Sequence, residues 1–545
     1  MSCIGLAFLA SAAPVAPGAG EILKTVPSPI PPPPAPATTN PVPSPPGAER
    51  PPFRGDLQQR IAVKRIVITG NTVFPESELL ALVRDAPGQT LTLEALNGLA
   101  ARITDYYRKR GYLLARAYIP AQDVTEGTLE IAVLEGRYGK IRLDNQSRIS
   151  DSALERLLQP LKIGQPVEAG LLEQQLLLLS DLPGAAISST LQPGVGTGTS
   201  DLAVTAAQTP AVSGSAGIDN WGNRYTGSWR TSANVDWASP LGQGDRLDLY
   251  GMGSEFGGTQ FGRLAYDLPV GSSGTRLGAA YADLKYALGL DFAPLRAHGS
   301  AEITSLYASQ PLTRSRLDNS TLTFDVDRRI LRDFIDSTSG SDAKVENVAN
   351  LGLNGSLKSV QGATTFWNAS VTSGRLTLDP VSAVVDQAAY HTAGTYFKAN
   401  GSGSQLWPLE GRWAFYGALS GQLASTNLDM SEKFSMGGPT GVRAYPVGEA
   451  MSDDAWLGTL EMRYALDEFI ELSGFADGGT ARINHTPIAA DAVNQRSLSG
   501  LGLGAAWKNR RNLSVLTYFA WRTGDAPTSA PERRPTVWAQ LTQGF

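Results

Sequence analysis

One arginine and one aspartate are the charged residues most able to form a specific contact in this chain. Arg443 lies in a glycine-rich stretch, residues 437–447, and Asp477 follows within residues 475–479. A buried charge without a partner costs on the order of several kcal/mol, so the guanidinium of Arg443 requires either water or a fixed carboxylate. We therefore predict an ion pair between Arg443 and Asp477.

Both residues belong to short motifs within a region of alternating, strand-like sequence. The candidate loop residues around the arginine are Gly441, Val442, Arg443, Ala444 and Tyr445, and the candidate partner residues are Phe475, Asp477 and Gly479. We expect these two motifs to form the main functional site.

Motifs that would indicate an enzyme are missing. Residues 194–200 are glycine-rich but lack the lysine of a phosphate-binding loop, so we interpret them as a connection between strands. Residues 500–504 imitate a dinucleotide fingerprint, yet no helix follows, and their alternation suits a strand with close neighbours. No serine nucleophile motif is found. We predict no enzymatic activity and no cofactor.

Metal and nucleic-acid sites are also unsupported. The three histidines, His298, His391 and His485, are far apart and show no metal-ligand spacing. The net charge of −5 provides no basic surface for nucleic acid. The single cysteine, Cys3, lies in the expected leader, so no disulfide framework is predicted.

The first 57 residues read as targeting and linker sequence. Residues 1–13 contain a short apolar run that ends in Ala10-Ser11-Ala12, the small-x-small form of a signal-peptidase site, although a basic segment before it is missing. Residues 14–57 are proline-rich and predict an extended linker. A five-residue segment in it, 20–24, is too short to predict a plug helix, so that feature stays open.

No apolar run of about 18 residues, the length of a membrane-spanning helix, occurs after the leader. The richest candidate, residues 171–179, is short and interrupted by polar residues. If the chain crosses a membrane, a closed β-barrel is the remaining structure that satisfies its own backbone hydrogen bonds.

Residues 58–137 predict a small α+β unit. Residues 61–68 form a strand-like run, 76–84 and 96–107 predict helices, and Leu113 to Ile119 and Thr128 to Leu134 predict two more strands. In the second helix, apolar residues recur at helical spacing until Gly111. The order is β-α-α-β-β.

The same order returns in residues 138–209, which makes an internal repeat. Residues 140–145 echo the opening strand, and residues 199–204 echo the last one. On the repeat alone, two small α+β modules of any purpose remain an equal alternative.

Residues 210–545 alternate polar and apolar side chains in short runs, as strands do when one face meets lipid and the other a polar lumen. Sixteen strands would leave roughly 21 residues for each strand and its connection, which suits a transmembrane barrel. In the last strand, Val537, Ala539, Leu541 and Phe545 share one face. The fold class predicted is therefore mainly β, with a C-terminal transmembrane barrel of about 16 antiparallel strands after two α+β units.

These motifs resemble a known family. The segments at 441–445 and 475–479 resemble the Val-Arg-Gly-Tyr loop and the Phe-x-Asp-x-Gly strand of two-partner secretion transporters, known as haemolysin secretion/activation proteins. Ala444 stands where that family usually has glycine. The tandem repeat resembles its polypeptide-transport-associated (POTRA) domains, and residues 219–227 resemble the start of its first barrel strand. The terminal Phe545 resembles the aromatic residue that barrel-assembly machinery recognises.

The resemblance implies a function. An outer-membrane transporter of a Gram-negative bacterium would bind an unfolded, TpsA-like exoprotein through periplasmic POTRA domains and pass it through the barrel without ATP. Arg443 would hold a loop inside the lumen by pairing with Asp477, with Tyr445 packed beside it. The implied partners are this exoprotein, outer-membrane lipid and the barrel-assembly machinery.

Other functions remain as alternatives. An outer-membrane insertion factor of the same superfamily typically carries more POTRA domains, and a passive porin would not need the tandem modules. A large soluble β-sandwich or propeller would explain neither the terminal aromatic residue nor the Arg443–Asp477 pair. A neighbouring gene that encodes a long, repeat-rich secreted protein would favour the transporter.

Overall fold

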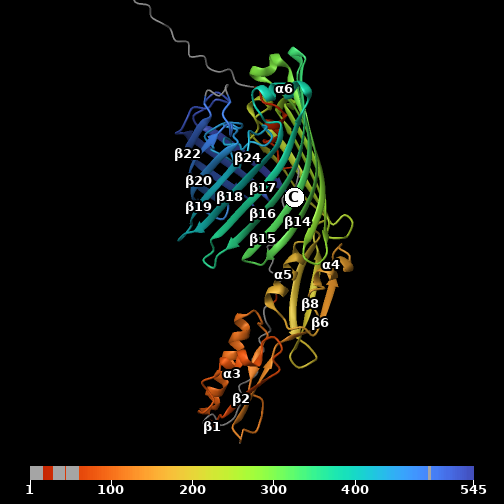
Figure 1. Cartoon of the computed structure of the whole chain (residues 1–545), viewed down its shortest axis with the longest axis vertical. Coiled ribbons are helices and arrows are strands. Elements are labelled where there is room, and N and C mark those ends of the chain that lie inside the picture. The colour runs from red at the N-terminus through yellow and green to blue at the C-terminus, as the bar shows by residue number, and fades with distance from the viewer. Residues whose placement is uncertain (1–15, 29–42, 44–59, 125, 489–492) are drawn as a thin grey trace, which may run out of the picture.

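The computed structural model describes residues 16–28, 43, 60–124, 126–488 and 493–545 (Figure 1). The predicted signal peptide, residues 1–13, lies outside the described residues, as does most of the proline-rich linker. From one end to the other in Figure 1, the described chain forms two small α+β units and a long barrel.

The main sheet and the two helices of the first α+β unit follow the predicted β-α-α-β-β order, and two short strands, β1 and β3, form an additional pair. The three-stranded sheet has the order β2-β5-β4, with β2 and β5 parallel. The long helix α3 buries a face of residues at helical spacing, including Leu96, Leu99, Ile103 and Tyr107, and the hydroxyl of Thr92 caps its first turn. The elements are β1 (Arg60–Ala62), β2 (Arg65–Thr69), α2 (Glu76–Ala81), β3 (Thr90–Thr92), α3 (Leu93–Lys109), β4 (Arg116–Tyr118) and β5 (Thr128–Leu134).

The second α+β unit repeats this topology, with sheet order β6-β8-β7 and β6 parallel to β8. Leucines of its two helices, among them Leu154, Leu176 and Leu179, fill a core against the sheet. Its elements are β6 (Arg137–Asn145), α4 (Asp151–Leu158), α5 (Ala169–Ser180), β7 (Ala185–Pro193) and β8 (Thr199–Gln208). The glycine-rich residues 194–198 connect β7 to β8, as predicted.

Three predicted boundaries are wrong. Residues 61–68 do not form one strand, because the chain bends at Val63 and Lys64: β1 pairs with β3, whereas β2 pairs with β5. The expected strand from Leu113 to Ile119 shortens to β4. Residues 219–227 follow the first barrel strand instead of beginning it, since that strand ends at Asp219.

Arg137 joins the two α+β units. Its guanidinium donates to the carboxylate of Glu135 at 2.7 Å and to the carbonyl of Gly164 at 2.8 Å. Burial acts to raise the pKa of Glu135, but hydrogen bonds from Thr72 and Val73 lower it on balance below its usual value. The carboxylate therefore stays charged opposite Arg137.

Sixteen antiparallel strands close into a barrel, in agreement with the predicted number. The strands are β9 (Val212–Asp219), β10 (Arg230–Ala238), β11 (Arg246–Ser254), β12 (Thr259–Val270), β13 (Thr275–Ala287), β14 (Ala297–Arg314), β15 (Asp318–Ile335), β16 (Gly340–Lys358), β17 (Thr364–Leu378), β18 (Gly394–Pro408), β19 (Trp413–Ala424), β20 (Asp454–Ala465), β21 (Ile470–Arg482), β22 (Gln495–Lys508), β23 (Leu513–Arg522) and β24 (Thr536–Gly544). Short 3-10 turns lie at Arg224–Thr226, Glu255–Gly257, Leu290–Leu295 and Asp336–Thr338, and helix α6 (Pro380–Ala388) joins β17 to β18.

Large apolar side chains cover the outside of the barrel. Alternate residues along each strand point outward, and many of them are exposed leucine, valine or aromatic residues, as lipid contact requires. Examples are Leu249, Leu264, Tyr281, Leu306, Val371, Leu423, Trp456 and Leu501. Among the described residues, no helix is long and apolar enough to cross a membrane.

The barrel closes through a short seam. Strands β24 and β9 pair over five residue pairs, Gln540–Asp219 to Gly544–Ser215, whereas β15 and β16 pair over eighteen. Phe545 extends this seam, because its backbone N–H and C=O both bond with Gly214, at 2.9 and 3.1 Å. The predicted terminal residue is thus part of the closure.

The second α+β unit is fixed to one end of the barrel. Asp181, at the end of α5, accepts two hydrogen bonds from the guanidinium of Arg314 at the end of β14, at 2.7 and 2.8 Å. Glu173 pairs with Arg316 in the turn that follows. In Figure 1 the unit lies beneath β14 and β15, while the turns between β16 and β19 extend beside it.

A short helix, α1 (Ala19–Leu23), lies inside the barrel. Ala19 and Ile22 are fully buried and pack with Tyr225, Leu284 and Tyr286. The backbone N–H of Ala19 donates to Asp333 on β15 at 2.8 Å. Part of the predicted linker is therefore ordered against the barrel wall.

Candidate functional site in the barrel lumen

The connection between β19 and β20, residues 425–453, folds back into the barrel, and we call it the lumen loop. Its two limbs pair through Phe434 and Ser452, whose backbones exchange hydrogen bonds of 2.7 and 3.0 Å. The motif residues Gly441, Val442, Arg443, Ala444 and Tyr445 form its tip, and all five are buried. Pairing of the limbs makes the loop a defined element that can hold its tip in one position.

Arg443 reaches Asp477 on β21. Its Nε donates to Oδ2 at 2.9 Å and its Nη2 to Oδ1 at 2.8 Å, and its backbone N–H donates to Oδ2 at 3.1 Å. Both side chains are nearly inaccessible to solvent. This two-point geometry is the strong form of an arginine–carboxylate contact, and the predicted partners are in contact.

A second carboxylate, which sequence reasoning missed, shares the same guanidinium. Glu461 on β20 accepts from Nη1 of Arg443 at 3.2 Å and from Nε of Arg463 at 3.1 Å. The hydroxyl of Thr459 also donates to Asp477. These residues meet only through the register of β20 and β21, and no spacing in the sequence singles them out.

Aromatic rings complete the arginine site. The guanidinium carbon of Arg443 lies 3.3 Å from the ring centre of Phe475 and 4.7 Å from that of Tyr518. Stacking of this kind favours arginine over lysine at the position. The hydroxyl of Tyr445, the residue expected beside Arg443, donates to the carbonyl of Asp525 at 2.7 Å. Gly479 lies under Met436 of the lumen loop.

The structure explains why alanine is tolerated at position 444, where the family usually has glycine. A Cβ atom at Gly500 on β22 would lie 2.5 Å from the Cβ of Ala444. The missing side chain at Gly500 therefore makes room for alanine in the loop tip. Gly502 likewise leaves space for the ring of Phe475, which explains the glycine alternation in residues 500–504.

This fit predicts a compensating pair of substitutions. Gly500→Ala should displace the loop tip and lower secretion several-fold, because real Cβ atoms essentially never approach within about 3.0 Å. Adding Ala444→Gly should restore most of the secretion, since it removes the clashing atom. Secretion per folded barrel is the measurement, and equal loss in the single and double variants would contradict this packing.

The base of the lumen loop is held by the opposite wall. Glu432 forms ion pairs with Arg329 on β15 and Lys398 on β18. Asp429 pairs with Lys344 on β16 at 2.8 Å. The loop is thus fastened to both sides of the lumen, by its base and by its tip.

Helix α1 lies against this base. A Cβ at Gly20 would come within 2.7 Å of the backbone nitrogen of Ser431, so the two backbones are in close contact. Glu21 accepts from the side chain of Asn223, and the carbonyl of Thr25 accepts from Arg230 on β10 at 2.6 Å. Together, α1 and the lumen loop occupy much of this part of the lumen.

The described residues contain no group of three or more histidine, cysteine or acidic residues placed to hold an ion. The carboxylates of this site are paired with arginine or lysine side chains, an arrangement that holds the lumen loop to the barrel wall.

Comparison with known proteins identifies the family of this chain. Residues 198–507, more than half of the chain, match the family described as haemolysin secretion/activation protein ShlB/FhaC/HecB. The chain belongs to this family. Residues 61–136 match the ShlB-type POTRA domain. As a haemolysin secretion/activation protein, the chain is an outer-membrane transporter of a secreted exoprotein.

Similar proteins cover most of its length. The heme/hemopexin transporter protein HuxB of Haemophilus influenzae (strain 86-028NP) is 25% identical over 85% of this chain and 83% of its own. The outer membrane transporter CdiB of Dickeya dadantii is 24% identical over 70% of this chain and 68% of its own. The solved structure of CdiB from Escherichia coli shares the fold, with a TM-score of 0.74, 22% identity and 94% of both chains covered.

Proposed function

We propose that this transporter binds its exoprotein unfolded, on the periplasmic side, and passes it through the barrel after the lumen loop has moved. The observation that carries the proposal is the buried contact of Arg443 with Asp477. It holds a loop across the lumen by hydrogen bonds and charge, which can break and re-form, whereas a permanent core would use apolar packing. Motifs 441–445 and 475–479 are thus the proposed control site.

The two α+β units are the proposed cargo receptors. We assign residues 58–137 and 138–209 to two periplasmic POTRA domains and residues 210–545 to the transporter barrel, with 1–13 as signal peptide and 14–57 as linker. Each three-stranded sheet has two edge strands, β2 and β4 in one and β6 and β7 in the other. An extended chain can add to such an edge through main-chain hydrogen bonds.

The proposed cargo is a large adhesin- or haemolysin-like exoprotein. The relatives named for heme/hemopexin transport and the CdiB transporters support a secreted protein partner. We propose that folding of this exoprotein outside the cell drives its export without ATP, and that the transporter has no catalytic activity. Outer-membrane lipid and the barrel-assembly machinery are its other proposed partners.

The occupied lumen disfavours a passive porin. A porin needs an open aqueous channel, whereas the lumen loop and α1 both lie within this barrel.

Localisation and transport can be tested together. The mature chain, produced with the exoprotein encoded beside its gene, should fractionate with the outer membrane and migrate faster on gels before boiling than after it. The exoprotein should accumulate in the medium only when the transporter is present. Folded transporter in the periplasm, or equal export without it, would refute the proposal.

A further inference from the structure

The tip of the lumen loop is bound to the last strand of the barrel as well as to Asp477. The indole N–H of Trp538 on β24 donates to the carbonyl of Arg443 at 2.7 Å. The hydroxyl of Thr536, at the start of β24, donates to the carbonyl of Ala444 at 3.1 Å. Two adjacent residues of the tip are therefore held by one strand.

The connection that leads into β24 is bound to the same loop. Glu449, which is fully buried, accepts hydrogen bonds from the backbone N–H and hydroxyl groups of both Thr528 and Ser529. Arg496 on β22 donates to the same carboxylate at 2.9 Å. The lumen loop and residues 525–538 thus share contacts along their length.

Strand β24 is also one side of the short seam. Beyond its five residue pairs with β9, the seam continues through the side chain of Asn220. The Nδ2 of Asn220 donates to the carbonyl of Val537 at 2.9 Å, and its Oδ1 accepts from the N–H of Ala539 at 2.8 Å. Trp538, which holds the loop tip, lies between these two residues.

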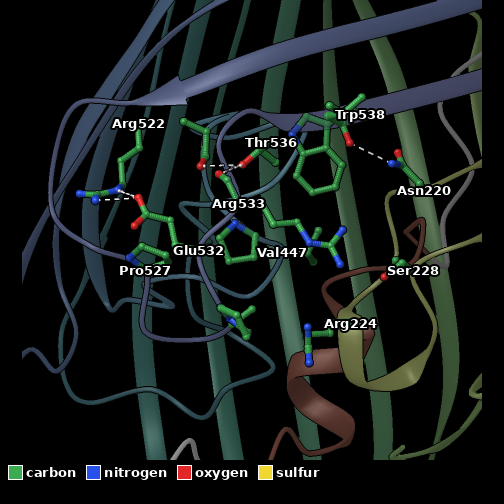
Figure 2. A pocket seen from close by; sticks show the side chains of 16 residues that line it. Asn220, Arg224, Ser228, Val447, Arg522, Pro527, Glu532, Arg533, Thr536 and Trp538 are labelled. Atoms are coloured by element: carbon green, nitrogen blue, oxygen red, sulfur yellow. Dashed lines mark hydrogen bonds and ion pairs between the residues drawn. The ribbon is translucent and has the colours of Figure 1, made fainter. Parts of the chain in front are cut away.

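Figure 2 shows the space where the loop and the seam meet. A cavity of about 90 Å³ is lined by Ala444 and Val447 of the loop, Thr536 and Trp538 of β24, and Asn220. Beside this cavity, the hydrogen bonds from Trp538 and Thr536 link the loop tip to β24.

We propose that Trp538 and Thr536 are positioning residues that couple the lumen loop to the seam, so that withdrawal of the loop tip loosens the pairing of β24 with β9. When the tip leaves Asp477, the carbonyl of Arg443 leaves the buried indole N–H. A buried N–H without an acceptor is unfavourable, and a movement of β24 that gives this group a new partner lowers the free energy. The seam has five ladder residue pairs, fewer than any other pairing of strands in the barrel, so it is the pairing most open to such a shift. This inference concerns loop and seam, and it holds or fails independently of which cargo is carried.

Hydrogen exchange of the folded barrel in detergent tests the coupling, because backbone exchange reports local opening. The variants are Trp538→Phe, which keeps an aromatic ring but loses the N–H donor, Arg443→Ala, and both together. Trp521→Phe is the matched control, since Trp521 lies on neighbouring β23 and is exposed on the outer face. Peptides from β9 and β24 report the seam, and peptides from β15 and β16 are the internal reference.

Each single variant should speed exchange in the seam peptides about tenfold, the effect expected from one buried hydrogen bond. The double variant should exchange at the rate of the singles, because both changes break one link. Exchange in β15 and β16, and in Trp521→Phe, should be unchanged. If Trp538→Phe does not fold, Thr536→Val takes its place.

Three results would overturn the coupling. Seam exchange in Trp538→Phe could equal that in Trp521→Phe, Arg443→Ala could leave the seam unchanged, or the two effects could multiply. The first would deny the link, the second would show that the tip does not affect the seam, and the third would mean that the residues act separately. None of these results requires secretion to be measured, so failure of the coupling is distinguishable from failure of the proposed transport role of Arg443.

Discussion

Arg443→Ala is expected to lower secretion roughly tenfold or more while the barrel still folds. The change leaves Asp477 as a buried carboxylate that has lost its arginine, a loss on the order of 3 to 5 kcal/mol for a fully desolvated pair. It also removes the group stacked on Phe475. Asp477→Ala should do less harm, because Glu461 stays within 3.2 Å of the guanidinium. Exoprotein in the medium, normalised to heat-modifiable barrel in the membrane, is the measurement.

The double variant tests whether Arg443 and Asp477 act as one pair or as two independent residues. Arg443→Ala with Asp477→Ala should be less damaging than the product of the two single effects, since both remove one contact. Arg510→Ala is the matched control, because Arg510 forms an exposed pair with Glu468 in a connecting turn, and exposed pairs contribute little. Effects that multiply strictly, or normal secretion in Arg443→Ala, would show that the tip contact does not control transport.

Deletion of residues 58–209 is expected to reduce secretion to background. The barrel should remain heat-modifiable, because its strands satisfy one another and do not depend on the α+β units for closure. We expect this loss of secretion because the unfolded exoprotein would no longer find the edge strands to which it binds. Exoprotein retained in the periplasm and exoprotein in the medium are both measured.

Arg102→Ala provides the comparison within the first unit, since Arg102 and Asp85 form a pair that is about half exposed on its surface. This variant should secrete at the wild-type level. Normal export after deletion of residues 58–209 would mean that the barrel alone recognises its cargo.

Periodicity and composition predicted most of the architecture. The β-α-α-β-β order follows from apolar spacing in segments such as 96–107, and the barrel from alternation, because these patterns record local burial. The error at residues 61–68 has a local cause. The bend at Val63 and Lys64 separates two strands whose residues have the same β-propensity, so composition alone does not reveal the break.

The candidate site was predictable only in part. The charge of Arg443 and the need to pair it led to Asp477. Glu461, Tyr518 and Trp538 also lie at Arg443, but they are brought there by the register of the strands in the closed barrel. Their spacing in the sequence does not indicate this contact. Helix α1 has five residues and little helical tendency of its own. Burial of Ala19 and Ile22 against the barrel stabilises it.

The attachment of the second α+β unit sets a direction of approach. Through Asp181, Glu173 and their arginine partners, this unit is anchored to the turn between β14 and β15, on one side of the barrel mouth. Figure 1 shows the unit beneath β14 and β15, so a polypeptide bound to it would meet the barrel at these strands and not on the barrel axis. The strands at this attachment, β15 and its neighbour β16, carry Arg329 and Lys344, so the wall nearest the unit is the one that holds the base of the lumen loop.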